Sequence, residues 1–200
     1  MKLYYSPGAC SLAAHIVCEE EDLKVDLVSV DLKAHVTADG ADYTAINPKG
    51  YVPALQLDDG SLLTENVAIL QYLGDRAPGL KLVPPGESAE RYRLQEWLAY
   101  ITAEVHKAFA PLFKDGSEAE KTKAKDVVLK RLKFVDAQLA SSPYLLGNAF
   151  GVADAYLFVM LLWCDKVGID LTPFTRLTAF RSYVGARKGV QAALKAEGLG

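Results

Sequence analysis

The sequence predicts an α/β domain followed by an all-α domain. Three observations indicate this division. Short β-type runs alternate with helical segments over residues 1–77, a stretch rich in proline and glycine follows, and beyond it apolar residues recur about every 3.6 positions without a strand pattern. With 200 residues, half of them hydrophobic, the chain is long enough to bury the core of one domain or of two small ones.

The first domain is expected to be built on short strands. The strands cover residues 3–5, 25–32, 53–57 and 61–63, and helices lie near 11–22 and 66–76. The turn Asp58-Asp59-Gly60 joins the last two strands as a hairpin. The order βαβ, then an irregular or helical stretch, then ββα predicts a thioredoxin-like sheet with helices on its faces.

The domain boundary is predicted in the proline- and glycine-rich stretch. We expect a thioredoxin-like domain over residues 1–77, a linker over 78–87 and an all-helical domain over 88–200. In the second half, the helical periods cover residues 87–113, 119–140, 152–167 and 174–196.

Composition and charge favour a small-molecule ligand and a cytoplasmic location. A formal net charge of -3 gives no reason to expect nucleic acid or an anionic membrane as a partner. The longest apolar run, from Ala155 to Cys164, is much shorter than the roughly 18 to 20 residues that cross a bilayer. Pro7-Gly8 interrupts any apolar export signal, and three cysteines, an odd number, argue against a disulfide framework. We expect no metal site.

Cys10 follows a Ser-Pro-Gly turn at the point where a helix is expected to begin. The free N–H groups and the positive end of the helix dipole favour a thiolate there, with a pKa below the free value of about 8.5. The alternative is a buried cysteine at a strand-to-helix junction. Position 13 is Ala13, so there is no Cys-x-x-Cys pair and a disulfide of Cys10 needs an external thiol. Cys18 and Cys164 are expected to be buried small hydrophobes.

A second feature is the proline in Val52-Pro53, at the start of a predicted strand. Proline cannot donate to the sheet ladder, and a cis bond here would leave the backbone of Val52 open to pair with an extended ligand. The alternative is an ordinary edge-strand proline.

A third feature is the start of the helix expected over residues 66–76. Asn66 or Thr64 is a plausible N-cap, and free N–H groups at such an end can hold a carboxylate while Glu65 pairs with an ammonium. The α-carboxylate and α-amine of an amino acid fit that pair. The alternative is plain helix capping.

A fourth feature lies on the helix expected over residues 87–113. Beside its core stripe runs a stripe of small residues that contains one imidazole: Ala99, Thr102, Ala103, His106 and Ala110. Such a stripe leaves room for a ligand, although a lone histidine beside a helix core is more often a packing residue.

Together these features resemble the glutathione transferase family, and the match is closest to the bacterial beta class. The matching segments are Tyr-Tyr-Ser-Pro-Gly-Ala-Cys-Ser at 4–11, Asn-Pro-Lys-Gly-Tyr-Val-Pro-Ala-Leu at 47–55, Leu-Thr-Glu-Asn-Val-Ala-Ile at 63–69, Glu-Val-His-Lys at 104–107, Leu-Gly-Asn at 146–148 and Val-Ala-Asp-Ala-Tyr-Leu at 152–157. They cover both predicted domains in the family's order.

The resemblance implies a role for each matching residue. Cys10 faces the thiol of glutathione and, with His106, is catalytic. The other residues implied to bind glutathione are Val52, through its backbone; Pro53, in the cis form; Glu65 and Asn66, on the γ-glutamyl group; His35, on the glycyl carboxylate; Lys107, which lies with His106 near the sulfur and the glycyl end; Ala103; and Glu104, which reaches the glutathione of a second subunit. Tyr5 and Tyr156 are implied to line the second-substrate pocket.

The chain departs from the family pattern at two binding positions and at one helix cap. Where the family usually has a lysine, His35 is a weaker and pH-dependent partner for the glycyl carboxylate. Ala99 stands where a polar asparagine is frequent, which removes that contact. Gly151 replaces the usual capping hydroxyl before Asp154, and we interpret Asp154 as a structural residue of the buried helix.

The implied function is conjugation of the glutathione thiol to electrophilic apolar substrates, with Cys10-dependent disulfide exchange beside it. Glutathione is then a co-substrate, no other cofactor is expected, and a homodimer is implied. Two alternatives stay open. The chain could be a glutathione-dependent thiol transferase or peroxidase, or a non-catalytic binding protein for apolar ligands.

Overall fold

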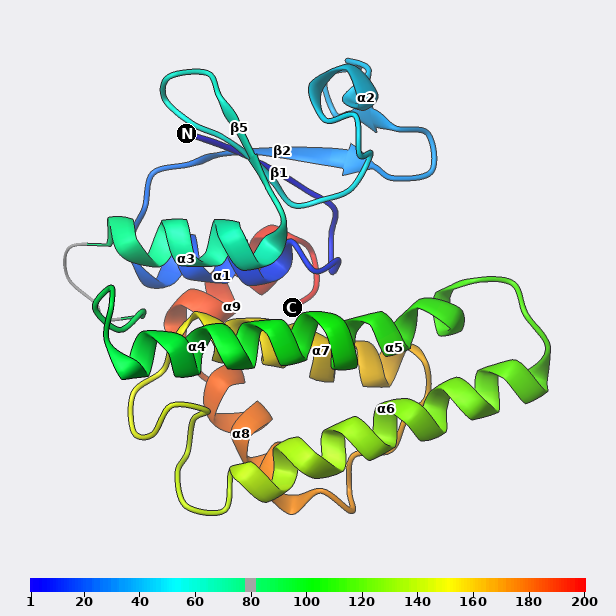
Figure 1. Ribbon diagram of the computed structural model, residues 1–200. Coiled ribbons are helices and arrows are strands. Elements are labelled where there is room, and N and C mark those ends of the chain that lie inside the picture. The colour runs from blue at the N-terminus through cyan, green and yellow to red at the C-terminus, as the bar shows by residue number, and fades with distance from the viewer. Residues whose placement is uncertain (78–81) are drawn as a thin grey trace. The chain divides into compact units, whose positions relative to one another are not determined.

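The computed structural model describes residues 1–77 and 82–200, and Figure 1 shows their path. The chain forms two compact units. One consists of Met1–Leu82 with Ala186–Gly200, and the other of Val83–Gly185. Residues 78–81 of the expected linker lie outside the described residues. In the described part, no helix is both long enough and apolar enough to cross a membrane.

The first unit contains a five-stranded mixed sheet in the order β3-β2-β1-β4-β5. Its strands are β1 (Lys2–Tyr5), β2 (Asp26–Asp31), β3 (Val36–Thr37), β4 (Ala54–Gln56) and β5 (Leu62–Thr64). β1 runs parallel to β2 and antiparallel to β4, while β4 and β5 form the predicted hairpin. The thioredoxin-like sheet is confirmed. The sequence did not predict β3, because a strand of two residues is too short to show an alternating pattern.

The helices of the first unit are α1 (Leu12–Glu20), α2 (Tyr43–Ile46), α3 (Asn66–Arg76) and α9 (Lys188–Ala196). α1 contacts both α3 and α9, and α1 and α3 lie side by side beneath the sheet in Figure 1. Every residue of α1 from Leu12 to Cys18 is buried, because α1 is covered by the sheet and by its two neighbouring helices.

The end of the chain differs from the prediction. Residues 174–196, expected as one helix of the second domain, form two helices, α8 (Thr175–Gly185) and α9, and residues 186–200 group with the first unit. Arg187, extended at the start of α9, pairs with Glu20 of α1. A Cβ added at Gly189 would lie 2.8 Å from the Glu20 backbone nitrogen, so the absence of a side chain lets the two helices approach. These contacts join residues that are far apart in the sequence. The helical period of residues 174–196 therefore does not indicate where α8 ends and α9 begins.

In the described residues of the second unit, all the named elements are helices. Its elements are α4 (Ala89–Tyr100), the π-helical η1 (Ile101–His106), α5 (Lys107–Phe109), the 3-10 helix η2 (Ala110–Phe113), α6 (Glu118–Gln138), α7 (Val152–Lys166) and α8. The predicted helix over 87–113 is therefore one helical path that changes its hydrogen-bonding pattern. The all-helical C-terminal part of the fold is confirmed.

α7 is the buried centre of the second unit. All its residues from Val152 to Leu161 are buried, as are Trp163 and Cys164. Asp154, only 1 % exposed, accepts hydrogen bonds from the backbone amide of Gly151 (2.8 Å) and from that of Leu145 (2.9 Å). Its carboxylate joins the start of α7 to the preceding loop, and this geometry agrees with the structural interpretation.

Candidate functional site

Cys10 lies in the loop between β1 and α1, two residues before the first residue of α1. Its thiol donates a hydrogen bond to the carbonyl oxygen of Val52, at 3.3 Å from Sγ. The side-chain amide of Asn66 donates to the carbonyl oxygen of Cys10 at 3.1 Å. Three predicted site residues from three distant segments are therefore joined by hydrogen bonds within the first unit.

The expected activation of Cys10 is wrong for this structure. Burial raises the pKa of its thiol to about 12, and Glu65 adds to this rise, while the backbone N–H groups of Cys10 and Ser11 act in the opposite direction. Desolvation penalises the charged sulfur more than the helix end stabilises it. At neutral pH Cys10 is a neutral thiol that donates a hydrogen bond. Cys18 and Cys164 are buried as predicted, and burial raises the pKa of each to about 12.

The peptide bond between Val52 and Pro53 is cis, as the family resemblance implies. The loop before it is held by Tyr51, whose carbonyl oxygen accepts from the hydroxyl of Tyr43 (2.7 Å) and from the side-chain amide of Asn47 (2.8 Å). Among the described residues, no backbone hydrogen bond is donated by the Val52 amide. Two hydrogen bonds thus hold the loop at Tyr51, while the backbone amide of Val52 has no backbone acceptor among the described residues.

The start of α3 differs from the prediction. The N-cap is Glu65, with a positive φ of 72°, and Asn66 is the first residue of the helix, so neither Asn66 nor Thr64 is the cap. The Glu65 side chain makes no capping hydrogen bond; its carboxylate pairs with the ammonium of Lys49 at 2.5 Å. The ammonium that pairs with Glu65 in this structure therefore belongs to the chain itself, and Lys49 was not predicted as its partner.

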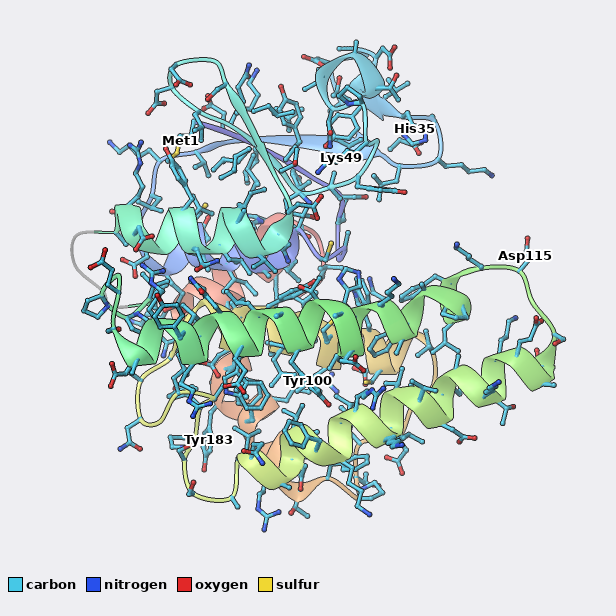
Figure 2. The ribbon with its side chains drawn as sticks, in the orientation of Figure 1. Met1, His35, Lys49, Tyr100, Asp115 and Tyr183 are labelled. Atoms are coloured by element: carbon cyan, nitrogen blue, oxygen red, sulfur yellow. The ribbon has the colours of Figure 1, made fainter. Side chains whose placement is uncertain are left out.

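His35 lies beside the loop that contains Lys49 and Gly50 (Figure 2). A Cβ added at Gly50, whose φ is 69°, would lie 3.0 Å from Cε1 of the His35 ring. The ring therefore packs directly against the glycine backbone, and a side chain at position 50 would both strain the backbone and displace the imidazole. The Nδ1 atom of His35 is buried without a hydrogen-bond partner among the described residues.

The sequence does not predict a buried pair in the first unit. The Glu197 carboxylate pairs with Nδ1 of His15 at 2.9 Å and accepts from the backbone amide of Gly8 at 2.8 Å. The ring of Tyr5 lies 5.9 Å from that of His15, and burial, with a contribution from Glu197, raises the pKa of Tyr5. This pair anchors the loop before Cys10 to the end of the chain. No local pattern could predict it, because Glu197 follows His15 by 182 residues.

In the second unit, the predicted residues lie on η1 and at the start of α5. Nδ1 of His106 is 2.5 Å from the hydroxyl oxygen of Tyr156, and burial lowers the pKa of His106. Glu104 pairs with Arg131 of α6 at 2.6 Å. Ala103 and Lys107 are exposed, as is Ala99 on α4.

Comparisons with known proteins identify the family. Residues 8–76 match the model "Glutathione S-transferase, N-terminal domain", and residues 100–188 match "Glutathione S-transferase, C-terminal domain". The chain is 48% identical over 200 residues to glutathione S-transferase GstA of Escherichia coli O157:H7, with all of both chains covered. It is 40% identical over 211 residues to glutathione S-transferase GST-4.5 of Xanthomonas campestris, again with full coverage of both.

Solved structures agree with this match. One is a ternary complex of BphK, described as a bacterial GST, with a TM-score of 0.97, 53% identity and complete coverage of both chains. A second is the beta-class glutathione S-transferase of Sphingomonas chungbukensis, with a TM-score of 0.97, 46% identity and complete coverage of both chains. The chain belongs to the glutathione S-transferase family and matches its bacterial beta class.

Proposed function

We propose that this chain is a glutathione transferase that joins the sulfur of glutathione to an electrophilic carbon of an apolar substrate. The observation that carries the proposal is the hydrogen-bonded set of Cys10, Val52 and Asn66 beside the cis Val52-Pro53 bond. The Val52 amide offers a backbone donor to an extended peptide, which adds to such an edge as a short strand. A sphingomonad relative, 47% identical over its whole chain, was solved in complex with glutathione, which supports the same ligand here.

The first unit supplies the groups that hold the tripeptide. Glu65 and Asn66 take the γ-glutamyl group, whose ammonium competes with Lys49 for the Glu65 carboxylate. The backbone of Val52 pairs with the cysteinyl residue, next to cis Pro53. His35 receives the glycyl carboxylate, and Tyr5 lines the acceptor side. The ammonium of the ligand then pairs with a carboxylate, its amide with a backbone group and its glycyl carboxylate with an imidazole.

The nucleophile in this chemistry is the thiolate of glutathione. It forms a carbon–sulfur bond with the acceptor while the leaving group departs with its electron pair, and the thiol proton is released. Because its pKa is raised, Cys10 is a neutral thiol at neutral pH and acts as a hydrogen-bond donor and not as the nucleophile of conjugation. Ala103, His106 and Lys107 are also proposed to bind glutathione, with His106 acting on the sulfur, and Glu104 is proposed to reach the glutathione of the other subunit.

An assay with two acceptors tests this function against its alternatives. At fixed glutathione, an aryl halide reports conjugation and a mixed disulfide reports thiol transfer. We expect turnover of the aryl halide, and we expect Cys10→Ala to reduce it only in part, because glutathione supplies its own sulfur. Turnover of the mixed disulfide alone would make the chain a thiol transferase. Turnover of neither acceptor, with glutathione still bound, would make it a binding protein.

Disulfide exchange at Cys10 is proposed as a second activity. The observation that favours it is access: the Cys10 side chain is half-buried, whereas Cys18 is 2 % exposed and Cys164 is not exposed. The thiolate of Cys10 attacks one sulfur of glutathione disulfide, a mixed disulfide forms, and the second glutathione leaves as a thiolate.

Replacing His35 with lysine is expected to lower the KM for glutathione two- to tenfold near pH 7.5. Lysine is charged at that pH, whereas the charge of histidine changes between pH 5 and 8, and a charged hydrogen bond to the glycyl carboxylate is stronger than a neutral one. Steady-state kinetics at varied glutathione measure the effect. Leu32→Lys adds the same charge at a nearby exposed position and serves as the control. An unchanged KM in His35→Lys would contradict the assignment of this residue.

A homodimer is also proposed, and an aromatic face on α4 and α6 supports it. Tyr100 points from α4 toward α6 (Figure 2), with its ring 5.1 Å from that of Phe134. Trp97 lies beside both rings, Phe134 is 47 % exposed and Tyr92 is 63 % exposed. A second copy would cover these rings, as aromatic clusters are covered at interfaces.

Sedimentation equilibrium at micromolar concentration is expected to show twice the mass of the chain, 43.4 kDa from two chains of 21.7 kDa. Phe134→Lys is expected to weaken the association, because it places a charge on the proposed contact. A fully active species of one chain mass would overturn the dimer. The cytoplasmic location and the absence of a further cofactor stay predictions. No cluster of three or more metal-binding side chains occurs among the described residues.

A further inference from the structure

The side chain of His106 is enclosed by groups of α7 within the second unit. Its Nδ1 atom is 2.5 Å from the hydroxyl oxygen of Tyr156. Its ring meets the ring of Trp163 edge-on, with centroids 4.8 Å apart and planes at 81°. Tyr156 and Trp163 are seven residues apart on one helix, so they project from the same face of α7. Two buried side chains of a single helix therefore define where this imidazole can point.

The backbone of η1 explains how His106 reaches α7. The amide of Lys107 donates to the carbonyl of Thr102, five residues earlier, which is the π-helical pattern. One extra residue in a turn rotates every later side chain by about 100° relative to α4, because an α-helix advances about 3.6 residues per turn. This local change sets the direction of His106, and π segments of this kind are frequent at functional sites.

The position of Tyr156 does not suit the role that the family resemblance implied. Its side chain is 1 % exposed, and its hydroxyl faces an imidazole instead of an open surface. A buried phenol with an apolar body and a hydrogen-bonded tip is suited to orienting a neighbour. The hydrogen bond of the Tyr156 hydroxyl thus indicates a role other than lining an apolar pocket.

The chemistry of the two groups decides which one donates. Burial lowers the pKa of His106, so its imidazole is neutral at neutral pH and has one N–H donor and one acceptor nitrogen. A phenol is a stronger acid than a neutral imidazole N–H, and an imidazole nitrogen is a stronger base than a phenol oxygen. The favoured hydrogen bond is therefore O–H to Nδ1, and the bond made by one ring nitrogen sets the state of the other.

We propose that Tyr156 is a positioning residue for conjugation: its hydroxyl donates to Nδ1 of His106, fixes the tautomer that carries hydrogen on Nε2, and so makes His106 an N–H donor toward the glutathione sulfur. An N–H group oriented before the reaction stabilises a thiolate without having to reorganise when the charge appears. The inference rests on the proposed function, because it assumes that His106 acts on the sulfur. It assigns no contact with the acceptor to Tyr156.

The first test observes the tautomer directly and needs no substrate. In protein labelled with nitrogen-15 at its three histidines, the resonances of His106 are assigned with His106→Gln and followed at pH 7.5. We expect hydrogen on Nε2 in the unaltered protein. In Tyr156→Phe, which keeps the ring and its packing, we expect the Nδ1 resonance to move and the tautomer preference to weaken. Tyr144→Phe removes a phenol hydroxyl elsewhere in the same unit and is expected to leave the His106 resonances unchanged. Hydrogen on Nδ1, or an identical spectrum in Tyr156→Phe, would overturn the proposal.

The second test is a double-mutant cycle on conjugation of an aryl halide. Tyr156→Phe is expected to lower kcat about three- to tenfold, as the loss of one hydrogen bond implies. In a His106→Gln background the same change is expected to have no further effect, because Tyr156 acts through the imidazole. Equal losses in both backgrounds would show a merely structural role and reject the proposal. If His106→Gln leaves kcat unchanged, the assumed role of His106 fails, whatever the tautomer measurement shows about Tyr156.

Discussion

Replacing Asp154 with alanine is expected to lower the free energy of unfolding by about 3 kcal/mol, while the affinity for glutathione changes little. The carboxylate accepts from the amides of Leu145 and Gly151 in a buried environment. Hydrogen bonds to charged groups are worth about 1.5 to 3 kcal/mol each, and alanine leaves both donors without this partner. α7, the buried centre of the second unit, would lose the bond that fixes its first turn.

Thermal melting and glutathione binding, measured on the same samples, test this expectation. Ser117→Ala is the matched control, because Ser117 caps the exposed start of α6 and its loss is expected to cost only about 1 kcal/mol. The melting temperature should therefore fall much more in Asp154→Ala than in the control. Unchanged melting together with lost binding would show that Asp154 belongs to the ligand site and would reject the structural assignment.

The rate at which Cys10 forms a mixed disulfide is expected to rise about tenfold for each pH unit between pH 7 and 9. A thiol whose pKa is raised to about 12 is charged in only about one molecule in 100,000 at pH 7, and the thiolate is the attacking species. Because the pKa lies above this whole range, the charged fraction grows with pH and reaches no plateau. A cysteine activated by its helix end would instead approach a constant rate near pH 8.

Intact-mass measurements after incubation with oxidised glutathione give the rate at each pH, and peptide mapping gives the position. Modification is expected at Cys10 and to be absent from Cys10→Ala, with Cys18 and Cys164 left free. Conjugation of an aryl halide in Cys10→Ala is expected to persist at a reduced level. A rate that is constant from pH 7 to 9 would show that the thiol is activated in solution. Modification at Cys18 or Cys164 alone would end the proposal that access favours Cys10.

The local sequence was sufficient for most of the fold. Alternating and helical periods predicted four of the five strands of the thioredoxin-like sheet and the helical second half. The hairpin turn at Asp58-Asp59-Gly60 was also predicted correctly, whereas the cis bond before Pro53 was implied only by the family resemblance. These features depend on residues that are neighbours in the chain, so a short window contains the physical cause of each. The resemblance to a family added the ligand, which no period or spacing could name.

The tertiary structure decided the chemical state of the site residues. The pKa of Cys10 follows from how much solvent the folded chain removes, a quantity that its position before a helix does not contain. Contacts between residues distant in the sequence pair Lys49 with Glu65 and Glu197 with His15, and bring the hydroxyl of Tyr156 within hydrogen-bond distance of His106.

Tertiary contacts also explain why residues 174–196 form two helices instead of the one expected. A tertiary contact with α1 separates α9 from α8, although residues 174–196 carry one continuous helical period. Sequence by itself determined most of the segments that form strands and helices, because periodicity is local, but not the two-residue β3 or the break between α8 and α9. Burial, ion pairs and hydrogen bonds between distant residues arise only when the chain has folded, and they set the charge and the direction of the groups that act on a ligand.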